Sequence, residues 1–149
     1  MPLLIGVPAE TLAGERRIAV VPDVAKKYQG LGASVLIQKG AGVPAHYRDA
    51  DFADVTLADS GEAVFGQADI LLRVQPPSAD EIALMKPGTV LIGMLQPWSS
   101  AERAKQLAER NITAFALELL PRISRAQSMD ILSSQAAVAG YECALIAAD

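Results

Sequence analysis

The chain has 149 residues, which is the size of one ordinary domain with a single core. Hydrophobic residues make up 51 % of it, charged residues 20 % and aromatic residues 5 %, which predicts an aliphatic core and excludes a disordered chain. The formal net charge of -4 argues against a protein that binds nucleic acid, because such proteins concentrate Lys and Arg against the phosphates.

The two ends of the chain and its single cysteine bear on location. Cys143 excludes an internal disulfide and a cluster of thiolate metal ligands, and its setting in GYECALIAA predicts a small buried side chain. The start, MPLLIGVPAE, lacks the basic residues and the length of a signal peptide. The last apolar segment, AAVAGYECALIAA, is shorter than a membrane span and contains Glu142. We therefore expect a soluble, cytoplasmic protein with no membrane span.

Short aliphatic runs recur along the chain, and most are continuous rather than alternating. That pattern is typical of strands that are buried on both faces of a sheet. The runs are LLIGV (3–7), SVLIQ (34–38), DVTLA (54–58), DILLRV (69–74), TVLIGML (89–95) and ITAFALEL (112–119).

Helical signals lie between these runs. In PDVAKKYQGLG, Pro22 fits the first position of a helix and Gly32 can end it. Two capping boxes, Ser78-Ala-Asp-Glu81 and Ser99-Ser-Ala-Glu102, predict the starts of two later helices. Strands that alternate with helices predict an α/β fold: a doubly wound, mostly parallel sheet of the Rossmann or flavodoxin type with helices on both faces.

Two other motifs do not support a site. Gly40-Ala-Gly42-Val-Pro-Ala45 matches a relaxed dinucleotide fingerprint, but too few residues follow it for the crossover helix that such a phosphate loop needs. His46 has no second imidazole or thiolate at ligand spacing, so we interpret it as a solvated loop residue and expect no metal site.

Near the N-terminus, GERRIAVVP places two arginines between a loop glycine and an apolar run. Arg17 could clamp a carboxylate with both arms of its guanidinium. The alternative, which the spacing alone favours, is a solvated pair of loop charges.

The stretch RISRAQSMDILSSQ concentrates uncharged polar residues between two apolar segments. Gln127, Asp130 and Ser133 recur every third residue, which predicts one face of a helical or 3₁₀ turn, with Arg122 one or two turns upstream. Such a face offers the groups that hold a planar carboxamide in one orientation. The alternative is that Ser124-Arg-Ala-Gln127 is a capping box and the rest a solvated helix start. The small-residue helix that follows ends without a glycine cap, so we expect it to continue or to enter a second domain.

At these residues the chain closely resembles the N-terminal part of the alpha subunits of proton-translocating NAD(P) transhydrogenases, a family related to the alanine dehydrogenases. The likeness covers essentially the whole chain, through IGVPAE, ERRIAVVP, KGAG, MKPG and, most specifically, PRISRAQSMDILSSQAAVAGY. The resemblance implies two doubly wound domains, the second with the G-x-G-x-x-G fingerprint for NAD. That fingerprint would lie beyond Asp149, so the chain would hold the first domain (1–126) and the nicotinamide-side loop with the start of the linking helix (127–149).

The resemblance also implies the cofactors and the partners. It implies that NAD(H) binds with Arg122, Gln127, Asp130 and Ser133 on its nicotinamide side, and that a partner domain binds NADP(H). It further implies membrane-spanning partner subunits or domains, a homodimer, and a position at the cytoplasmic face of the inner membrane. Arg17 would be ancestral carboxylate machinery.

Two alternatives stay open. An alanine dehydrogenase would carry a lysine and a histidine where this chain has Gln75 and Gln96, and glutamine has no accessible pKa for the proton transfer that amino acid oxidation needs. Hydride transfer between two nicotinamides needs no such base, because positioning and exclusion of water are what the protein supplies. The second alternative is a non-catalytic ligand-sensing or assembly module.

Overall fold

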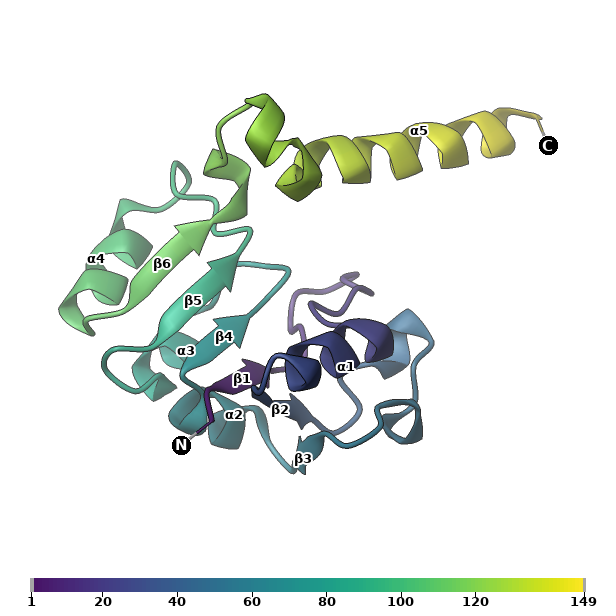
Figure 1. Ribbon diagram of the computed structural model, residues 1–149. Coiled ribbons are helices and arrows are strands. Elements are labelled where there is room, and N and C mark those ends of the chain that lie inside the picture. Colours follow the sequence, from purple (N-terminus) through teal and green to yellow (C-terminus); the bar gives the residue numbers. More distant parts are fainter. Residues whose placement is uncertain (1, 149) are drawn as a thin grey trace.

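The computed structural model describes residues 2–148 and contains a six-stranded sheet in which every neighbouring pair of strands is parallel (Figure 1). The strand order is β3-β2-β1-β4-β5-β6. Each strand lies within one of the predicted aliphatic runs, so all six strand predictions are confirmed. The strands are β1 (Leu4–Val7), β2 (Ser34–Gln38), β3 (Thr56–Ala58), β4 (Ile70–Leu72), β5 (Val90–Gly93) and β6 (Thr113–Ala116).

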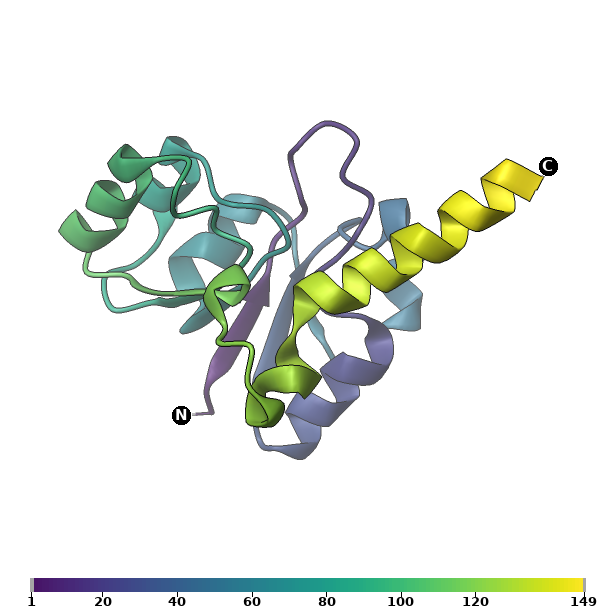
Figure 2. The same cartoon turned by 90° about the horizontal axis from the view of Figure 1, so that it is seen from above.

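Helices cover both faces of this sheet, which confirms the predicted doubly wound α/β fold. The α-helices are α1 (Pro22–Gly30), α2 (Gly61–Gln67), α3 (Ala79–Leu84), α4 (Ala101–Glu109) and α5 (Ile131–Ala148). Four 3₁₀ turns lie in the connections, two between β2 and β3 and two between β6 and α5: η1 (Val43–Ala45), η2 (Asp49–Asp51), η3 (Leu117–Leu119) and η4 (Ser124–Met129). Helix α1 lies on one face and α2, α3 and α4 lie on the other (Figures 1 and 2). The sequence signals did not predict α2.

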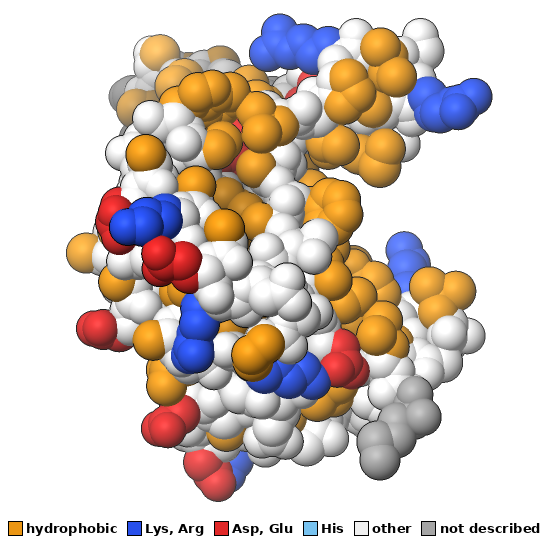
Figure 3. Space-filling model, turned by 90° about the vertical axis from the view of Figure 1, so that its left-hand side faces the viewer, with side chains coloured by type: hydrophobic (Ala, Val, Ile, Leu, Met, Phe, Trp, Pro, Cys, Tyr) orange, Lys and Arg blue, Asp and Glu red, His pale blue; other side chains and the backbone are white. Residues whose placement is uncertain are grey.

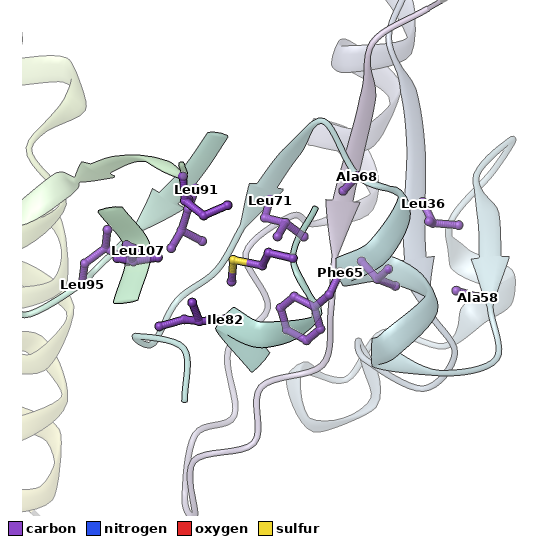
Figure 4. Close-up of a cluster of buried hydrophobic side chains, with 12 residues drawn as sticks. Leu36, Ala58, Phe65, Ala68, Leu71, Ile82, Leu91, Leu95 and Leu107 are labelled. Carbon is purple, nitrogen blue, oxygen red and sulfur yellow. The ribbon is translucent and has the colours of Figure 1, made fainter. Parts of the chain in front are cut away.

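The buried side chains form two clusters, one on each face of the sheet. In β2, Leu36 belongs to the cluster under α2, α3 and α4, while Val35 and Ile37 belong to the cluster under α1. Figure 4 shows the first cluster, where Leu71 and Leu91 meet side chains of the covering helices. Two buried faces explain why the strands read as continuous apolar runs rather than alternating ones.

One predicted capping box is confirmed and one is wrong. Ser78 and Glu81 cap α3 reciprocally, as predicted. Helix α4 is capped by Ser100, whose hydroxyl accepts a hydrogen bond from the Arg103 N–H, and not by Ser99. The Ser99 hydroxyl instead donates to the Gln96 carbonyl, because the preceding turn uses that serine and moves the helix start by one residue.

The face of β5 and β6 opposite α4 carries no helix among residues 2–148 (Figures 1 and 2). Phe115 on β6 is 56 % exposed as a consequence. Seen from the side of α4, the molecule is hollowed between a projecting segment and the body, and hydrophobic side chains gather along this hollow (Figure 3).

Helix α5 projects away from the domain (Figures 1 and 2), and two predictions fail there. Cys143 is exposed, not buried, because the described chain packs nothing against its side of the helix. The helix also starts earlier than expected, at Ile131, so it reaches 18 residues. Within residues 2–148 it is the one helix that is long and apolar enough to cross a membrane by length and composition alone.

Candidate functional site

The strand order reverses beside β1, because the chain adds β2 and β3 on one side and then β4, β5 and β6 on the other. In open α/β sheets, ligands bind at this switch point, outside the carboxyl ends of the strands. The loops that follow β1, β4 and β5 meet there, together with the segment that leads from β6 into α5 (Figure 2).

Glu10 fixes the loop that follows β4. Its carboxylate accepts hydrogen bonds from the backbone N–H of Val74 at 2.7 Å and of Gln75 at 3.1 Å. Both bonds satisfy amides that leave the end of a strand, so the backbone of Gln75 is held by a residue from the loop after β1.

Glu118 does the same for the loop that follows β5. Its carboxylate accepts from the N–H of Leu95 at 3.2 Å and of Gln96 at 2.5 Å. Glu10 and Glu118 thus hold the backbone of Gln75 and Gln96, the two glutamines singled out from the sequence. The sequence interpretation missed both carboxylates, although an acidic residue close behind a buried strand was a usable signal.

A buried cluster of ion pairs lies at the end of β4, next to this edge of the sheet. Arg73, at the end of β4, is 4 % exposed and pairs with Glu81 at 2.5 Å and with Glu10 at 3.2 Å. Its guanidinium carbon lies 5.7 Å from the centre of the Phe65 ring. Because Glu10 also holds the loop after β4, the ion cluster and the loop are one connected structure.

Arg17 is the centre of a second polar group, the Arg17 cluster, which consists of Glu15, Arg17, Gln75 and Gln135. The Glu15 carboxylate accepts hydrogen bonds from Arg17 Nε at 2.8 Å and from Arg17 Nη2 at 2.6 Å. Arg17 Nη1 donates to Gln135 Oε1 at 2.9 Å. Gln75 Nε2 donates to Glu15 Oε2 at 2.6 Å. Arg17 therefore does hold a carboxylate with two arms, but that carboxylate belongs to this chain.

The Arg17 hydrogen bonds, with smaller help from Gln75, lower the pKa of Glu15 to about 2 against opposing desolvation. The same pairing with Glu15 raises the pKa of Arg17 above its ordinary value. The neighbouring Arg16 is exposed and forms no hydrogen bond with another residue in the described part of the chain. Of the two neighbouring arginines, Arg17 is therefore hydrogen-bonded within the chain and Arg16 is solvated.

The Arg17 cluster borders a space of about 540 Å³, the central hollow, which lies on the α1 face of the sheet, between α1 and the start of α5. Its lining is mainly apolar, and it is lined by Arg17, Ile18, Ala19, Tyr28, Leu72, Arg73, Val74, Ile92, Met94, Leu117, Ile131 and Gln135.

A second, more polar space of about 360 Å³ lies against η4 and the first turn of α5. This Gln127 hollow is lined by Pro121, Arg122, Ile123, Ser124, Ala126, Gln127, Asp130 and Ser133. The structure therefore brings Arg122, Gln127, Asp130 and Ser133, the four residues predicted for the nicotinamide side, to one small space. Gln127 is exposed, and its side-chain amide forms no hydrogen bond with another residue between 2 and 148.

Asp130 has a structural task in addition. Its Oδ1 accepts from the N–H of Leu132 at 3.0 Å and of Ser133 at 3.1 Å, and its Oδ2 accepts from the Ser133 hydroxyl at 2.6 Å. Hydrogen bonding to Ser133 lowers the pKa of Asp130. Asp130 is thus an ionised acceptor at the start of α5, and the alternative of a capping box begun by Ser124 is wrong, since η4 has no side-chain cap.

The remaining candidates lie elsewhere. The segment between Gly40 and β3 forms only the three-residue turns η1 and η2, so the fingerprint lacks the crossover helix that a phosphate loop needs. A Cβ on Gly42 would lie 2.8 Å from the Tyr47 carbonyl oxygen, which gives this glycine a packing reason instead. His46 is exposed, and residues 2–148 contain no group of three or more His, Cys, Asp or Glu side chains that could hold a metal ion.

Comparison with known proteins places this geometry in a family. An NAD(P) transhydrogenase alpha-subunit protein of Rhodospirillum rubrum is 44 % identical over 148 residues, which cover 95 % of this chain and 38 % of that protein. The crystal structure of transhydrogenase from Sinorhizobium meliloti superimposes with a TM-score of 0.93 at 36 % identity, over 97 % of this chain and 44 % of that one. An L-alanine dehydrogenase structure gives a TM-score of 0.75 at 27 % identity, over 78 % of this chain and 32 % of that one.

The chain thus spans well under half the length of these relatives. Residues 6–139 match the family described as alanine dehydrogenase/PNT, N-terminal domain. The chain belongs to this family of N-terminal domains, and within it resembles the alpha subunits of NAD(P) transhydrogenases.

Proposed function

We propose that the chain is the N-terminal part of the NAD(H)-binding component of an NAD(P) transhydrogenase, which transfers hydride between NADH and NADP⁺. One observation carries the proposal: Arg122, Gln127, Asp130 and Ser133 line one hollow against η4 and the first turn of α5, and the Gln127 amide is free to bind a ligand. In this proposal residues 1–126 form the N-terminal domain, and residues 127–149 form the nicotinamide-side loop and the start of the linking helix.

The donor set of the Gln127 hollow suits a nicotinamide carboxamide. Gln127 offers an amide donor and an amide acceptor, and Asp130 offers an ionised acceptor. A nicotinamide held there supplies the hydride chemistry. The chain's own residues would orient the ring and exclude water, which is sufficient because no substrate proton has to be moved.

The relatives are named as transhydrogenase subunits, which supports the presence of partner subunits. We propose that a separate domain binds NADP(H), that membrane-spanning subunits couple the reaction to proton translocation, and that the assembled protein is a homodimer at the cytoplasmic face of the inner membrane. We assign α5 to the linking helix rather than to a span. The match to the Sinorhizobium meliloti transhydrogenase supports this, because its 97 % coverage includes most of the 18 residues of α5.

An alanine dehydrogenase is the second candidate, since an L-alanine dehydrogenase shares the fold. Amino acid oxidation needs a group that moves a proton and a free cation for the substrate carboxylate. Gln75 and Gln96 cannot move a proton at neutral pH, and Arg17 is already engaged by Glu15. These three observations favour the transhydrogenase.

The proposal is tested on the chain itself by NMR titration with reduced nicotinamide mononucleotide, the nicotinamide half of NADH. We expect weak binding with shifts at the Gln127 side-chain amide and the Ser133 N–H. Gln127→Leu should abolish these shifts, whereas Gln67→Leu, which changes an exposed glutamine on α2, should not.

NADH should bind the chain no more tightly than its nicotinamide half, because the fingerprint for the pyrophosphate is expected beyond Asp149. Calorimetric titration measures this. Micromolar affinity for NADH, or shifts confined to the central hollow, would contradict the proposal.

A further inference from the structure

Helix α5 is attached to the domain by few groups. Its residues are exposed except Ile131, which is half-buried, and it contacts η3. Among residues 2–148, one hydrogen bond joins α5 to a residue that precedes Asp130: the bond from Arg17 Nη1 to Gln135 Oε1 at 2.9 Å. Among the described residues, Arg17 is therefore the side chain before Asp130 that hydrogen-bonds to α5, in addition to the contacts of α5 with η3.

Other hydrogen bonds fix Arg17 on the side away from α5. Glu15 accepts from two of its guanidinium nitrogens, Gln75 donates to Glu15, and Glu10 accepts from the backbone N–H of Gln75. A continuous series of hydrogen bonds thus runs from the end of β4 through Glu15 and Arg17 to Gln135 on α5.

The chemistry of each member suits this task. A guanidinium can face a carboxylate with a planar fork and still present a third nitrogen, whereas a lysine ammonium has no fixed fork. Gln75 provides an amide donor without a positive charge, so Glu15 stays paired with Arg17.

The hydrogen bond between Arg17 and Gln135 and the Gln127 hollow lie on different faces of the first two turns of α5. Ile131 and Gln135 are four residues apart and face the central hollow, while Asp130 and Ser133 face the Gln127 hollow. A rotation or tilt of α5 at Gln135 would therefore move Asp130 and Ser133 relative to Gln127.

We infer that Glu15, Arg17, Gln75 and Gln135 form a positioning device: they fix the first two turns of α5 and so set the shape of the Gln127 hollow. The effect on nicotinamide binding rests on the proposed function, but the effect on α5 does not. Arg17 is a positioning residue here, and Glu15 occupies the guanidinium that a substrate carboxylate would need.

The test measures the position of α5 directly in the full chain. Cys143 is the single cysteine and is exposed on α5, so it can carry one spin label, and Lys26→Cys on α1 can carry the second. Pulsed electron paramagnetic resonance should give one narrow distance distribution between the two labels.

Arg17→Met and Gln135→Leu should each lose this narrow distribution and give a broad one. Gln135→Glu should preserve it, because a carboxylate still accepts from Arg17, while Arg17→Lys should not. Arg16→Met is the matched control and should leave the distribution unchanged, since Arg16 lies one residue away and is solvated. An unchanged distribution in both Arg17→Met and Gln135→Leu would overturn the inference.

A titration with reduced nicotinamide mononucleotide separates the two proposals. If Arg17→Met broadens the distances and also weakens the shifts at Gln127, both stand. If it broadens the distances while Gln127→Leu leaves nicotinamide binding intact, the positioning device stands and the proposed function fails. If the distances stay narrow, the positioning device fails whatever the titration gives.

Discussion

The Arg17 cluster and the Gln127 hollow lie on different faces of the first turns of α5, and both are polar. In the cluster, Glu15, Arg17 and Gln135 are bound to one another. In the hollow, the side chains of Arg122 and Gln127 form no hydrogen bond with any residue from 2 to 148. Polar groups that the fold satisfies contribute to stability, whereas groups left free beside a hollow are available to a ligand. Substitutions should therefore change stability and geometry in the first region, and binding in the second.

Arg73 lies outside both regions but is ion-paired and buried, although its Nε has no hydrogen-bond partner among the described residues, and Arg73→Met should have the largest effect. The substitution leaves the Glu10 and Glu81 carboxylates, whose side chains are 4 % and 13 % exposed, without their cation. Removing one partner from such a buried network costs about 3 to 5 kcal/mol. Urea unfolding measures the loss.

The control is Lys105→Met, because both members of the Lys105–Glu109 pair are well exposed. Such a pair contributes less than about 1 kcal/mol. Equal losses in the two variants would show that the Arg73 network does not stabilise the fold.

Gln127→Asn tests the Gln127 hollow, where the polar side chains are free to bind a ligand. In a polypeptide that joins this chain to an NAD-fingerprint domain, single-turnover hydride transfer to NADP⁺ should slow by about 10- to 100-fold, because the shorter side chain misplaces the ring. NADH affinity should change less than the rate. The free energy of unfolding should stay within about 0.5 kcal/mol of the parent, as for other exposed substitutions.

Gln67→Asn serves as the control for that rate, since Gln67 is exposed on α2 and lies away from the hollow. Unchanged hydride transfer in Gln127→Asn would remove Gln127 from the proposed site.

How much of this comparison the sequence could predict depends on the range of the contacts. The strands followed from local apolar runs. Gln127, Asp130 and Ser133 do line one hollow, but not as one face of a single turn: η4 ends at Met129, Asp130 is extended, and α5 begins at Ile131. The hydrogen bonds from Glu10 to Val74 and Gln75 span more than sixty positions of sequence, so no local pattern contains them.

Two failures have local physical reasons. The start of α4 moved from Ser99 to Ser100 because a turn at Gln96 uses the first serine. The burial of Cys143 was wrong because an apolar helix sequence does not say which partner covers it, and the described chain offers none.

The Arg17–Glu15 pair should make stability depend on pH. The pKa of Glu15 falls from its ordinary 4.5 to about 2 in the folded chain, so its carboxylate stabilises the fold above about pH 4.5. This contribution is lost as the pH falls from 4.5 toward 2. Because the Arg17 side chain is 42 % exposed, solvent screening reduces the contribution to about 1 kcal/mol.

The measurement compares urea unfolding of the parent and Glu15→Gln at several pH values. The variant should be less stable at pH 7, and the difference should shrink as the pH approaches 2. A difference that stays constant with pH would mean that the ion pair does not stabilise the fold.

Asp130 belongs to both sides of the comparison, since it lines the Gln127 hollow and also caps α5. Asp130→Ala should free the N–H groups of Leu132 and Ser133 and cost the start of the helix about 0.5 to 1 kcal/mol. Hydrogen exchange should then accelerate at these two amides while the amides of the sheet keep their protection. Asp130→Asn retains a carbonyl oxygen as the cap and should keep most of that protection, yet it loses the charge that faces the hollow. Slow hydride transfer in Asp130→Asn with intact protection would separate the ligand-facing role from capping, whereas unchanged protection in Asp130→Ala would show that Asp130 does not hold the helix start.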